Sequence, residues 1–140
     1  MVRFRGKYGW LSNMYECEIV VGGDRYWSVE AAFQSCKCKN AADRKLFIEN
    51  RNPVECKKLG RKIEMRDDWE KVKVNVMCWL LYAKFSNAEL KHKLLSIDDE
   101  LLVEENDWND RYWGVCNGSG LNMLGECLKR VKRKLMEEEV

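Results

Sequence analysis

Three side chains of kinds used in catalysis occur at helical spacing: Glu30, Gln34 and Lys37. Positions i, i+4 and i+7 fall within about 60° of one another around a helix, so an acid, an amide and an amine would point the same way. The helix dipole favours an ionised carboxylate in the first turn, which would be ready to face a developing positive charge. The alternative interpretation is a solvated helix face with one weak ion pair, which is the more frequent case for an average helix.

A second group of chemically capable residues lies in segment 107–114, which has neither helical nor strand periodicity. Its eight residues include two Trp, one Tyr, two Asp and one Arg. Aromatic rings beside acids and an Arg suit a pocket that stacks a planar ring and polarises a group attached to it. The alternative is a folded loop whose Trp residues fill the core.

Two basic or glycine-rich segments could contact phosphate. Gly118-Ser119-Gly120 precedes a predicted helix and could present backbone N–H groups to a phosphate, although it matches no established nucleotide-binding sequence. The basic run 129–134 is interleaved with core positions and is followed by three Glu, which favours ordinary charge at a helix C-terminus over nucleic-acid binding.

No metal or cofactor is expected. The seven cysteines are irregularly spaced and contain no CxxC pair, and the single histidine, His92, is flanked by two lysines that disfavour a bound cation. An odd number of cysteines among apolar neighbours predicts reduced thiols. Reduced thiols in turn predict that the protein functions in the reducing cytoplasm.

The elements that must position these residues begin with a hairpin and a helix. Alternating residues on either side of Gly22-Gly23 predict a β-hairpin between residues 15 and 27. Ser28 is the expected N-cap of a helix over 29–38. Its apolar residues recur with helical period and predict one buried stripe, opposite Glu30.

Capping residues predict the next helices. Asn52-Pro53, with an acid at the third helical position, starts one helix. Asp67 starts another, which is apolar nearly all round between residues 76 and 83 and is therefore expected to be central and covered on several sides.

The C-terminal half continues the pattern. Ser86 is the expected cap of a short helix, residues 101–103 form a candidate strand, and apolar positions from Leu124 to Leu135 define a last helix. The sum is an α+β fold: a compact, mostly helical single domain with a small antiparallel sheet.

Composition bounds these expectations. One hundred and forty residues are enough for one core and not for two, so residues 1–140 are expected to form one domain. With 46% hydrophobic and 34% charged residues, the chain is expected to be too apolar to stay disordered and too highly charged to be embedded in a lipid bilayer. A net charge of +2 neither requires nor excludes a polyanionic partner.

Taken in order, the unusual residues resemble the NADAR (YbiA-like) family. Each motif is loose, but seven in register over essentially the whole chain are specific. Met14 stands where the family commonly has Phe, and Ser86 where Gln is usual, which concerns substrate fit more than chemistry. The motifs are Trp10-Leu11-Ser12-Asn13-Met14-Tyr15, Ser28-Val29-Glu30-Ala31-Ala32-Phe33-Gln34 with Lys37, Leu59-Gly60-Arg61, Arg66-Asp67-Asp68-Trp69, Lys84-Phe85, Asp110-Arg111-Tyr112-Trp113-Gly114 and Gly120-Leu121-Asn122-Met123-Leu124-Gly125.

The resemblance implies a metal-independent N-glycosidase without a cofactor. YbiA-like members cleave the ribosyl C–N bond of early, phosphorylated riboflavin intermediates. Matching positions imply that Glu30, Trp69 and Asp110 are catalytic, although the apolar pattern alone places Trp69 in the core. The implied substrate-binding residues are Asn13, Lys37, Arg61, Trp113, Gly120 and Asn122.

These roles agree with the chemistry of the reaction. Breaking an N-glycosidic bond passes through an oxocarbenium-like state, which a carboxylate stabilises. Glu30 is expected to stabilise that charge or activate water, with Asp110 as its partner, and the assignment is interchangeable. Trp69 and Trp113 would stack the heterocycle, while cations would hold phosphate.

Other functions fit the same residues. Family members are also associated with ADP-ribose and with removing it from guanine, so one alternative is an ADP-ribosyl hydrolase, and another is a non-catalytic ADP-ribose or NAD-binding module. Only an enzyme needs two carboxylates converging on the anomeric carbon. The expected partner is a small ribosyl or ADP-ribosyl molecule, with nucleic acid only as ADP-ribosylated substrate and no membrane.

Overall fold

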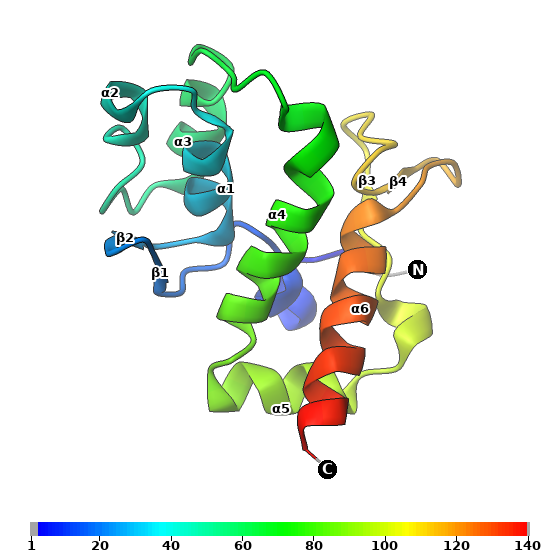
Figure 1. Ribbon diagram of the computed structural model, residues 1–140. Coiled ribbons are helices and arrows are strands. Elements are labelled where there is room, and N and C mark those ends of the chain that lie inside the picture. Colours follow the sequence, from blue (N-terminus) through cyan, green and yellow to red (C-terminus); the bar gives the residue numbers. More distant parts are fainter. Residues whose placement is uncertain (1–2, 140) are drawn as a thin grey trace. The chain divides into compact units, whose positions relative to one another are not determined.

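Two compact units make up the computed structural model, which describes residues 3–139 (Figure 1). One unit runs from Asn13 to Lys84, and the other joins the N-terminal segment up to Ser12 with the segment from Phe85 onward. Helices dominate, with a small antiparallel sheet, so the predicted α+β class is confirmed. That residues 1–140 form a single domain stays a prediction.

The hairpin of the Asn13–Lys84 unit forms where the sequence predicted it. Strands β1 (Ile19–Val21) and β2 (Asp24–Tyr26) pair antiparallel. Gly22 and Gly23 have φ angles of 57° and 86°, a left-handed conformation that glycine adopts without steric cost.

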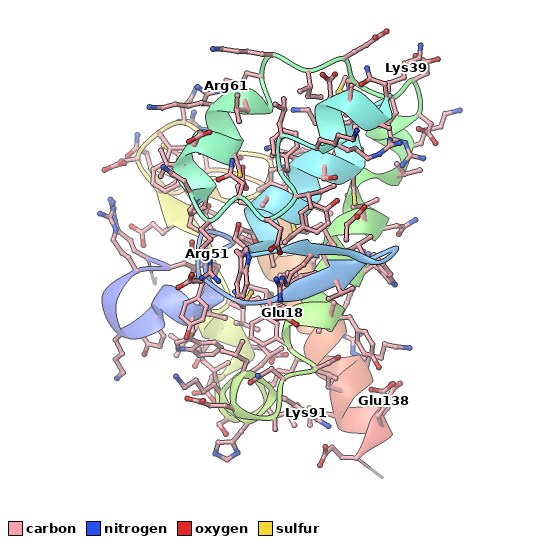
Figure 2. All side chains as sticks on the ribbon, turned by 90° about the vertical axis from the view of Figure 1, so that its left-hand side faces the viewer. Glu18, Lys39, Arg51, Arg61, Lys91 and Glu138 are labelled. Carbon is pink, nitrogen blue, oxygen red and sulfur yellow. The ribbon has the colours of Figure 1, made fainter. Side chains whose placement is uncertain are left out.

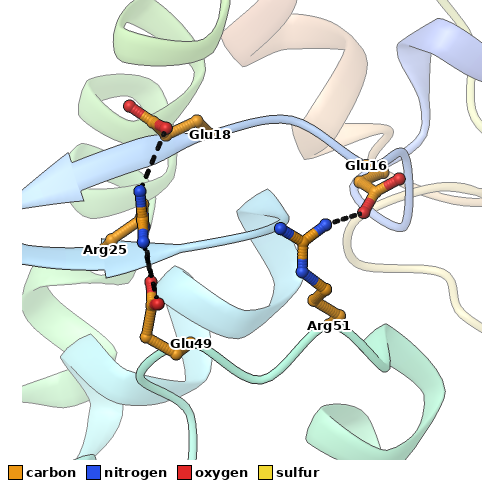
Figure 3. A network of polar contacts seen from close by, with 5 residues as sticks. All are labelled: Glu16, Glu18, Arg25, Glu49 and Arg51. Carbon is orange, nitrogen blue, oxygen red and sulfur yellow. Dashed lines mark hydrogen bonds and ion pairs between the residues drawn. The ribbon is translucent and has the colours of Figure 1, made fainter.

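A polar network joins the hairpin to the segment after α2 (Ala41–Arg44). The Arg25 guanidinium donates to Glu49 at 2.5 and 2.9 Å, and Arg51 lies with its guanidinium carbon 3.6 Å from the centroid of the Trp27 ring. Each exposed pair contributes little by itself, but together they fix the two segments to each other. Figure 3 shows the charged members, Glu16, Glu18, Arg25, Glu49 and Arg51.

Helix α1 (Val29–Lys37) begins at the predicted cap. The hydroxyl of Ser28 accepts a hydrogen bond from the Ala31 amide at 3.0 Å. Every residue from 29 to 35 is buried, whereas one buried stripe was predicted. The expectation of a solvated face opposite the stripe is therefore wrong, because α3 and α4 both pack on α1.

The other two helices of this unit are α3 (Pro53–Leu59) and α4 (Trp69–Lys84). Asn52 caps α3 as predicted, accepting from the Glu55 amide at 3.0 Å. The predicted coverage of α4 is wrong at Trp79, which is 54% exposed.

Two predictions for the other unit are wrong. Helix α5 (Ala88–Ser96) is capped by Asn87 rather than Ser86, and residues 101–103 form no strand. A 3₁₀ helix, η2 (Asp99–Leu101), occupies the start of that segment, and the paired residues come later. The remaining elements are η1 (Gly6–Leu11), β3 (Glu105–Asn106), β4 (Val115–Cys116) and α6 (Met123–Glu138), and β3 pairs with β4 in parallel.

Helix α6 is the predicted last helix, and its apolar positions Leu124, Leu128, Val131 and Leu135 are buried. All seven cysteines are free thiols, as expected. Within the described chain, no helix is both long and apolar enough to cross a membrane.

The cap of α5 gives a direct test of the local structure. The Asn87 side chain accepts from the amides of Glu89 and Leu90 at 3.1 and 3.2 Å. We expect Asn87→Ala to lower the free energy of unfolding by about 1 kcal/mol, the usual cost of losing an N-cap. Ser86→Ala is the matched variant, and urea denaturation that showed it to be the more costly change would restore Ser86 as the cap.

Candidate functional site

Glu30 lies in the first turn of α1 and is only 8% exposed. Its backbone N–H donates to the carbonyl of Asn13 at 3.0 Å, which fixes the helix start against the preceding turn. Its side-chain Oε1 accepts from Gln34 Nε2, also at 3.0 Å. The predicted acid and amide are therefore joined, inside the protein rather than on its surface.

Burial dominates the electrostatics of this carboxyl. Loss of hydration raises the pKa of Glu30 above its ordinary value. The hydrogen bond from Gln34 opposes the rise, as do the charges of Lys57, Lys37 and Arg61. Desolvation is the largest of these effects and sets the direction of the shift. The favourable contribution of the helix dipole stays a prediction. A carboxyl with a raised pKa can exchange protons closer to neutral pH than an exposed one.

The side chain of Gln34 packs closely against Gly60, the residue that ends α3. A Cβ atom built on Gly60 would lie 2.0 Å from Gln34 Oε1 and 2.4 Å from its Cδ, so any larger residue would displace the amide. The same oxygen is buried and finds no hydrogen-bond partner among the described residues. From the sequence, Gly60 was only a weak point in a helix, and its place in the Leu59-Gly60-Arg61 motif was the signal available.

Asn13 is a predicted binding residue that the structure brings next to Glu30 through its backbone. Its Nδ2 lies 3.6 Å from the sulfur of Met77, a weak acceptor. Its Oδ1 is buried and has no partner within the described part of the chain. Asn13 and Gln34 thus both carry an unpaired acceptor, which is uncommon in a folded protein.

Cations surround this carboxyl from two helices. Lys37 is half-buried at the end of α1, and burial lowers its pKa, an effect that the charge of Glu30 partly offsets. Arg61 is exposed just after α3, as Figure 2 shows. Lys57, on α3, acts on Glu30 with them and was missed by the sequence analysis. Such a group of cations suits a phosphate.

Trp69 is buried at the start of α4, with its ring centroid 4.9 Å from that of Phe33 at an interplanar angle of 58°. This confirms the core position that the apolar pattern predicted. The catalytic role implied by the resemblance stays a prediction.

Lys84 is a second buried titratable group that received no predicted role. Only 1% of it is exposed, and burial lowers its pKa to about 8. Its ammonium lies 5.3 Å from the centroid of the Tyr15 ring, at the far end of α4 from Trp69. The Lys84-Phe85 motif was the sequence signal that marked it.

Asp110 and Trp113 belong to the other unit, in the loop 107–114 that the sequence predicted. Asp110 Oδ1 accepts from the backbone amides of Tyr112 and Trp113 at 3.1 and 2.9 Å, which shapes the turn. Trp108 is 53% exposed and Trp113 is half-buried against Tyr112. The alternative that these Trp residues fill the core is therefore wrong.

The start of α6 is already supplied with acceptors. The amides of residues 121 to 124 donate to carbonyls of residues 111 to 114 at 2.8 to 3.2 Å. These backbone donors at the helix start after Gly118-Ser119-Gly120 are therefore already hydrogen-bonded within the protein. Gly120 is required by close packing, since a Cβ there would lie 2.2 Å from the Gly114 carbonyl oxygen. These helix-start amides are therefore not available to a phosphate, and a contribution from the turn's own amides stays a prediction.

Asn122 has a structural task. Its Oδ1 accepts from the Glu104 amide at 2.9 Å and its Nδ2 donates to the Leu102 carbonyl at 3.0 Å. It thereby ties the start of α6 to the segment before β3. A contact between Asn122 and substrate stays a prediction.

A cavity of about 650 Å³ opens on the Asn13–Lys84 unit, but none of the predicted site residues line it. Its walls include Cys36, Arg44 and Trp79. Arg66 also lines the cavity and makes a bidentate ion pair with Asp68, its Nε and Nη2 donating to the two carboxylate oxygens at 2.6 and 3.0 Å. Among residues 3–139, no three His, Cys, Asp or Glu side chains are grouped to hold a metal ion.

Comparison with known proteins decides the family. The family model of the NADAR domain matches residues 3–136. This chain belongs to the NADAR domain family. The family expected from the motifs is thus confirmed, and it covers both units of this NADAR chain.

Several relatives of the NADAR chain have names that state an activity. An N-glycosidase of Nostoc punctiforme is 37% identical over 136 residues, which cover 91% of this chain and 86% of that protein. The N-glycosidase YbiA of Escherichia coli is 35% identical over 136 residues, covering 94% and 84%. A riboflavin biosynthesis protein of Vibrio vulnificus is 31% identical over 134 residues, and this chain spans only 36% of its length.

The fold has a solved counterpart. The NMR structure of YbiA from Escherichia coli matches with a TM-score of 0.84 at 31% sequence identity, covering 99% of this chain and 84% of that one.

The raised pKa of Glu30 predicts a pH-dependent cost in stability. Because the folded state favours the protonated acid, the cost is absent below the ordinary pKa of 4.5 and develops as the pH rises through the raised value. Glu30→Gln is therefore expected to melt higher than the wild type at pH 7 to 8, with a difference that shrinks toward zero near pH 4. Thermal unfolding across this range measures it. Glu55→Gln, at an exposed position of α3, is the control, and a Glu30→Gln difference that is constant with pH would contradict the assignment.

Proposed function

We propose that this chain is an N-glycosidase that hydrolyses the ribosyl C–N bond of a small phosphorylated molecule. The observation that carries the proposal is Glu30: a buried carboxyl with a raised pKa, held by an amide and surrounded by Lys37, Lys57 and Arg61. The names of the Nostoc and Escherichia coli relatives support hydrolysis of an N-glycosyl bond.

The proposed reaction follows from what a buried carboxylate does to charge. As the C–N bond lengthens, its electron pair moves to the leaving nitrogen and positive charge grows on the anomeric carbon. Ionised Glu30 stabilises this charge more strongly in a dry site than it would in water. Water adds to the anomeric carbon and gives up one proton, and the leaving nitrogen takes up one proton. Glu30 can receive the proton from water because its pKa is raised toward neutral.

Asp110 is proposed as the second carboxyl. Its Oδ1 accepts from two backbone amides of the turn, so Oδ2 is the oxygen proposed to face the substrate. Trp69 and Trp113 are proposed to contact the heterocycle, as the resemblance implies. Asn13, Gly120 and Asn122 are proposed as further binding residues, with the structural duties already described for each.

A phosphorylated ribosylaminopyrimidine is the proposed substrate class. The cations near Glu30 call for an anionic group on the substrate. The Vibrio vulnificus relative, and an Arabidopsis thaliana protein that is 40% identical over 96 residues, are named riboflavin biosynthesis proteins. This chain spans 36% and 16% of those proteins, so their names support the substrate class without extending their other activities to this chain.

The deciding experiment is turnover by Glu30→Gln. We expect at least about a hundredfold loss in the rate of base release from a ribosylaminopyrimidine phosphate, the usual scale for removing a catalytic acid or base. The substitution keeps the shape and the hydrogen bond to Gln34, so the protein stays folded. Asp110→Asn, measured beside it, tests the second carboxyl. A folded Glu30→Gln protein with a rate near that of the wild type would exclude Glu30 from catalysis.

The phosphate role of the cations has its own test. Charge-assisted contacts are worth about 1.5–3 kcal/mol each, so Lys37→Ala or Arg61→Ala is expected to lower kcat/KM for the phosphorylated substrate by about 10- to 150-fold. The dephosphorylated substrate lacks the contact and is expected to lose little. Lys62→Ala removes an exposed neighbouring cation and serves as the control. Equal losses on both substrates would argue against phosphate binding.

A further inference from the structure

The amide of Gln34 is one of two in the Asn13–Lys84 unit whose oxygen is buried without a hydrogen-bond partner among the described residues. Its Nε2 is used by Glu30, but its Oε1 is buried without a partner and rests over Gly60. An unpaired buried acceptor costs free energy, and an apolar side chain of the same size would avoid that cost. The single hydrogen bond from Gln34 to Glu30 therefore does not by itself explain why this position carries a carboxamide.

We propose that Gln34 is a positioning residue that forms a hydrogen bond with both the ionised and the protonated form of Glu30. Gly60, which has no side chain, leaves the space that the Gln34 amide needs to lie within hydrogen-bond distance of Glu30. The catalytic meaning of this pairing rests on the proposed function, although the pairing itself does not. Ionised Glu30 accepts from the Gln34 NH₂ group, as observed. Protonated Glu30 donates its O–H to Gln34 Oε1 after the amide turns over by 180°.

A carboxamide provides both a donor and an acceptor at one place. It carries two donors on nitrogen and an acceptor oxygen at nearly the same distance from the chain, so a half-turn exchanges them without moving the helix. In each orientation one polar end faces Gly60 unpaired, so the desolvation cost is similar in both states. Glu30 thus keeps a hydrogen bond while it gains and loses the proton that the proposed reaction passes through it.

Gly60 gives independent access to the same contact. Its φ angle is −61°, a value that any residue adopts, so the backbone does not require glycine here. The obstacle to a larger residue is the end of Gln34, since a Cβ would lie 2.0, 2.4 and 3.0 Å from its Oε1, Cδ and Cγ. Gly60→Ala therefore displaces the amide, because the three heavy atoms nearest to the new Cβ all belong to Gln34.

Few other charges complicate the titration. The titratable groups that act on Glu30 are Lys37 from α1, Lys57 and Cys56 from α3, and Arg61 after it. Burial raises the pKa of Cys56 to about 11, so this thiol does not ionise between pH 4 and 8. Between pH 4 and 8, a change in the Glu30 carboxyl signal therefore reports Glu30 itself.

The test is a titration of Glu30 by NMR, with ¹³C in the Glu side-chain carboxyls and Glu30→Gln to assign the signal. Hydrogen bonds to a charged group are about twice as strong as neutral ones, so losing the amide harms the ionised form more. We expect Gln34→Met and Gly60→Ala each to move the Glu30 midpoint to higher pH. In a Gln34→Ala background, Gly60→Ala is expected to add no further change, because its clash partner is gone.

Two further readouts separate this role from a merely structural one. The side-chain NH₂ resonances of Gln34 are expected to change with the same midpoint as Glu30, since the amide turns over, and resonances constant through that midpoint would overturn the two-state pairing. Ser35→Ala removes the 2.7 Å hydrogen bond to Tyr26 from the same helix and is expected to leave the midpoint unchanged. A midpoint unmoved by Gln34→Met and Gly60→Ala, or moved equally by Ser35→Ala, would overturn the proposal.

The activity of the same variants keeps the two proposals apart. If the chain is an N-glycosidase, the acidic limb of its kcat/KM profile is expected to follow the titration to higher pH in Gln34→Met and Gly60→Ala. If the wild type releases no base, the proposed function fails while the titration result stands. If Glu30→Gln leaves turnover intact, only the catalytic role of Glu30 fails. If the limb stays fixed while the titration moves, Glu30 does not act as the base, and the link between pairing and catalysis fails alone.

Discussion

Placing a carboxyl group out of water is the constraint on which the Asn13–Lys84 unit depends. Glu30 sits at a helix start that α3 and α4 cover, and its desolvation outweighs the attractions that favour its charge. The surrounding groups limit that cost: one hydrogen bond from Gln34, and cations from two helices. A carboxyl balanced in this way gains its proton at a higher pH than an exposed glutamate, whereas a fully ion-paired one stays ionised to lower pH. Reactivity and instability at this position have the same physical origin.

The same constraint explains residues that have no chemistry of their own. Gly60 is needed because Gln34 must pass close to the backbone, and the Ser28 cap and the Asn13 carbonyl fix the first turn of α1 from outside the helix. A site that depends on one hydrogen bond of 3.0 Å tolerates little movement of the helix that carries it. Hence the capping and packing contacts serve the carboxyl as much as they serve the fold.

Local patterns predicted the fold well, and tertiary packing set the limit. The hairpin, the Ser28 and Asn52 caps and the last helix depend on neighbours in sequence, and all were found as predicted. The cap of α5 was predicted one residue too early, because Ser86 and Asn87 are adjacent and both are residue types that cap helices. The row from Glu30 to Lys37 was recognised, but its burial was not, since periodicity shows which residues share a face and not how many helices cover it. Lys57 and Gly60 were missed for the same reason.

Of the two candidate ways of binding phosphate, the structure supports side-chain cations better than backbone amides at a helix start. The helix-start mechanism needs unpaired backbone amides, and at α6 those amides are used by the carbonyls of the aromatic loop, which orders Asp110 and Trp113 instead. Side-chain cations need no such vacancy, and around Glu30 they have a second effect, since their charge lowers the cost of ionising the buried acid. An arriving phosphate would neutralise part of that charge and so raise the pKa of Glu30 further. Under the proposed function, substrate binding and the proton affinity of the carboxyl would therefore be coupled through Lys37, Lys57 and Arg61, before any bond is broken.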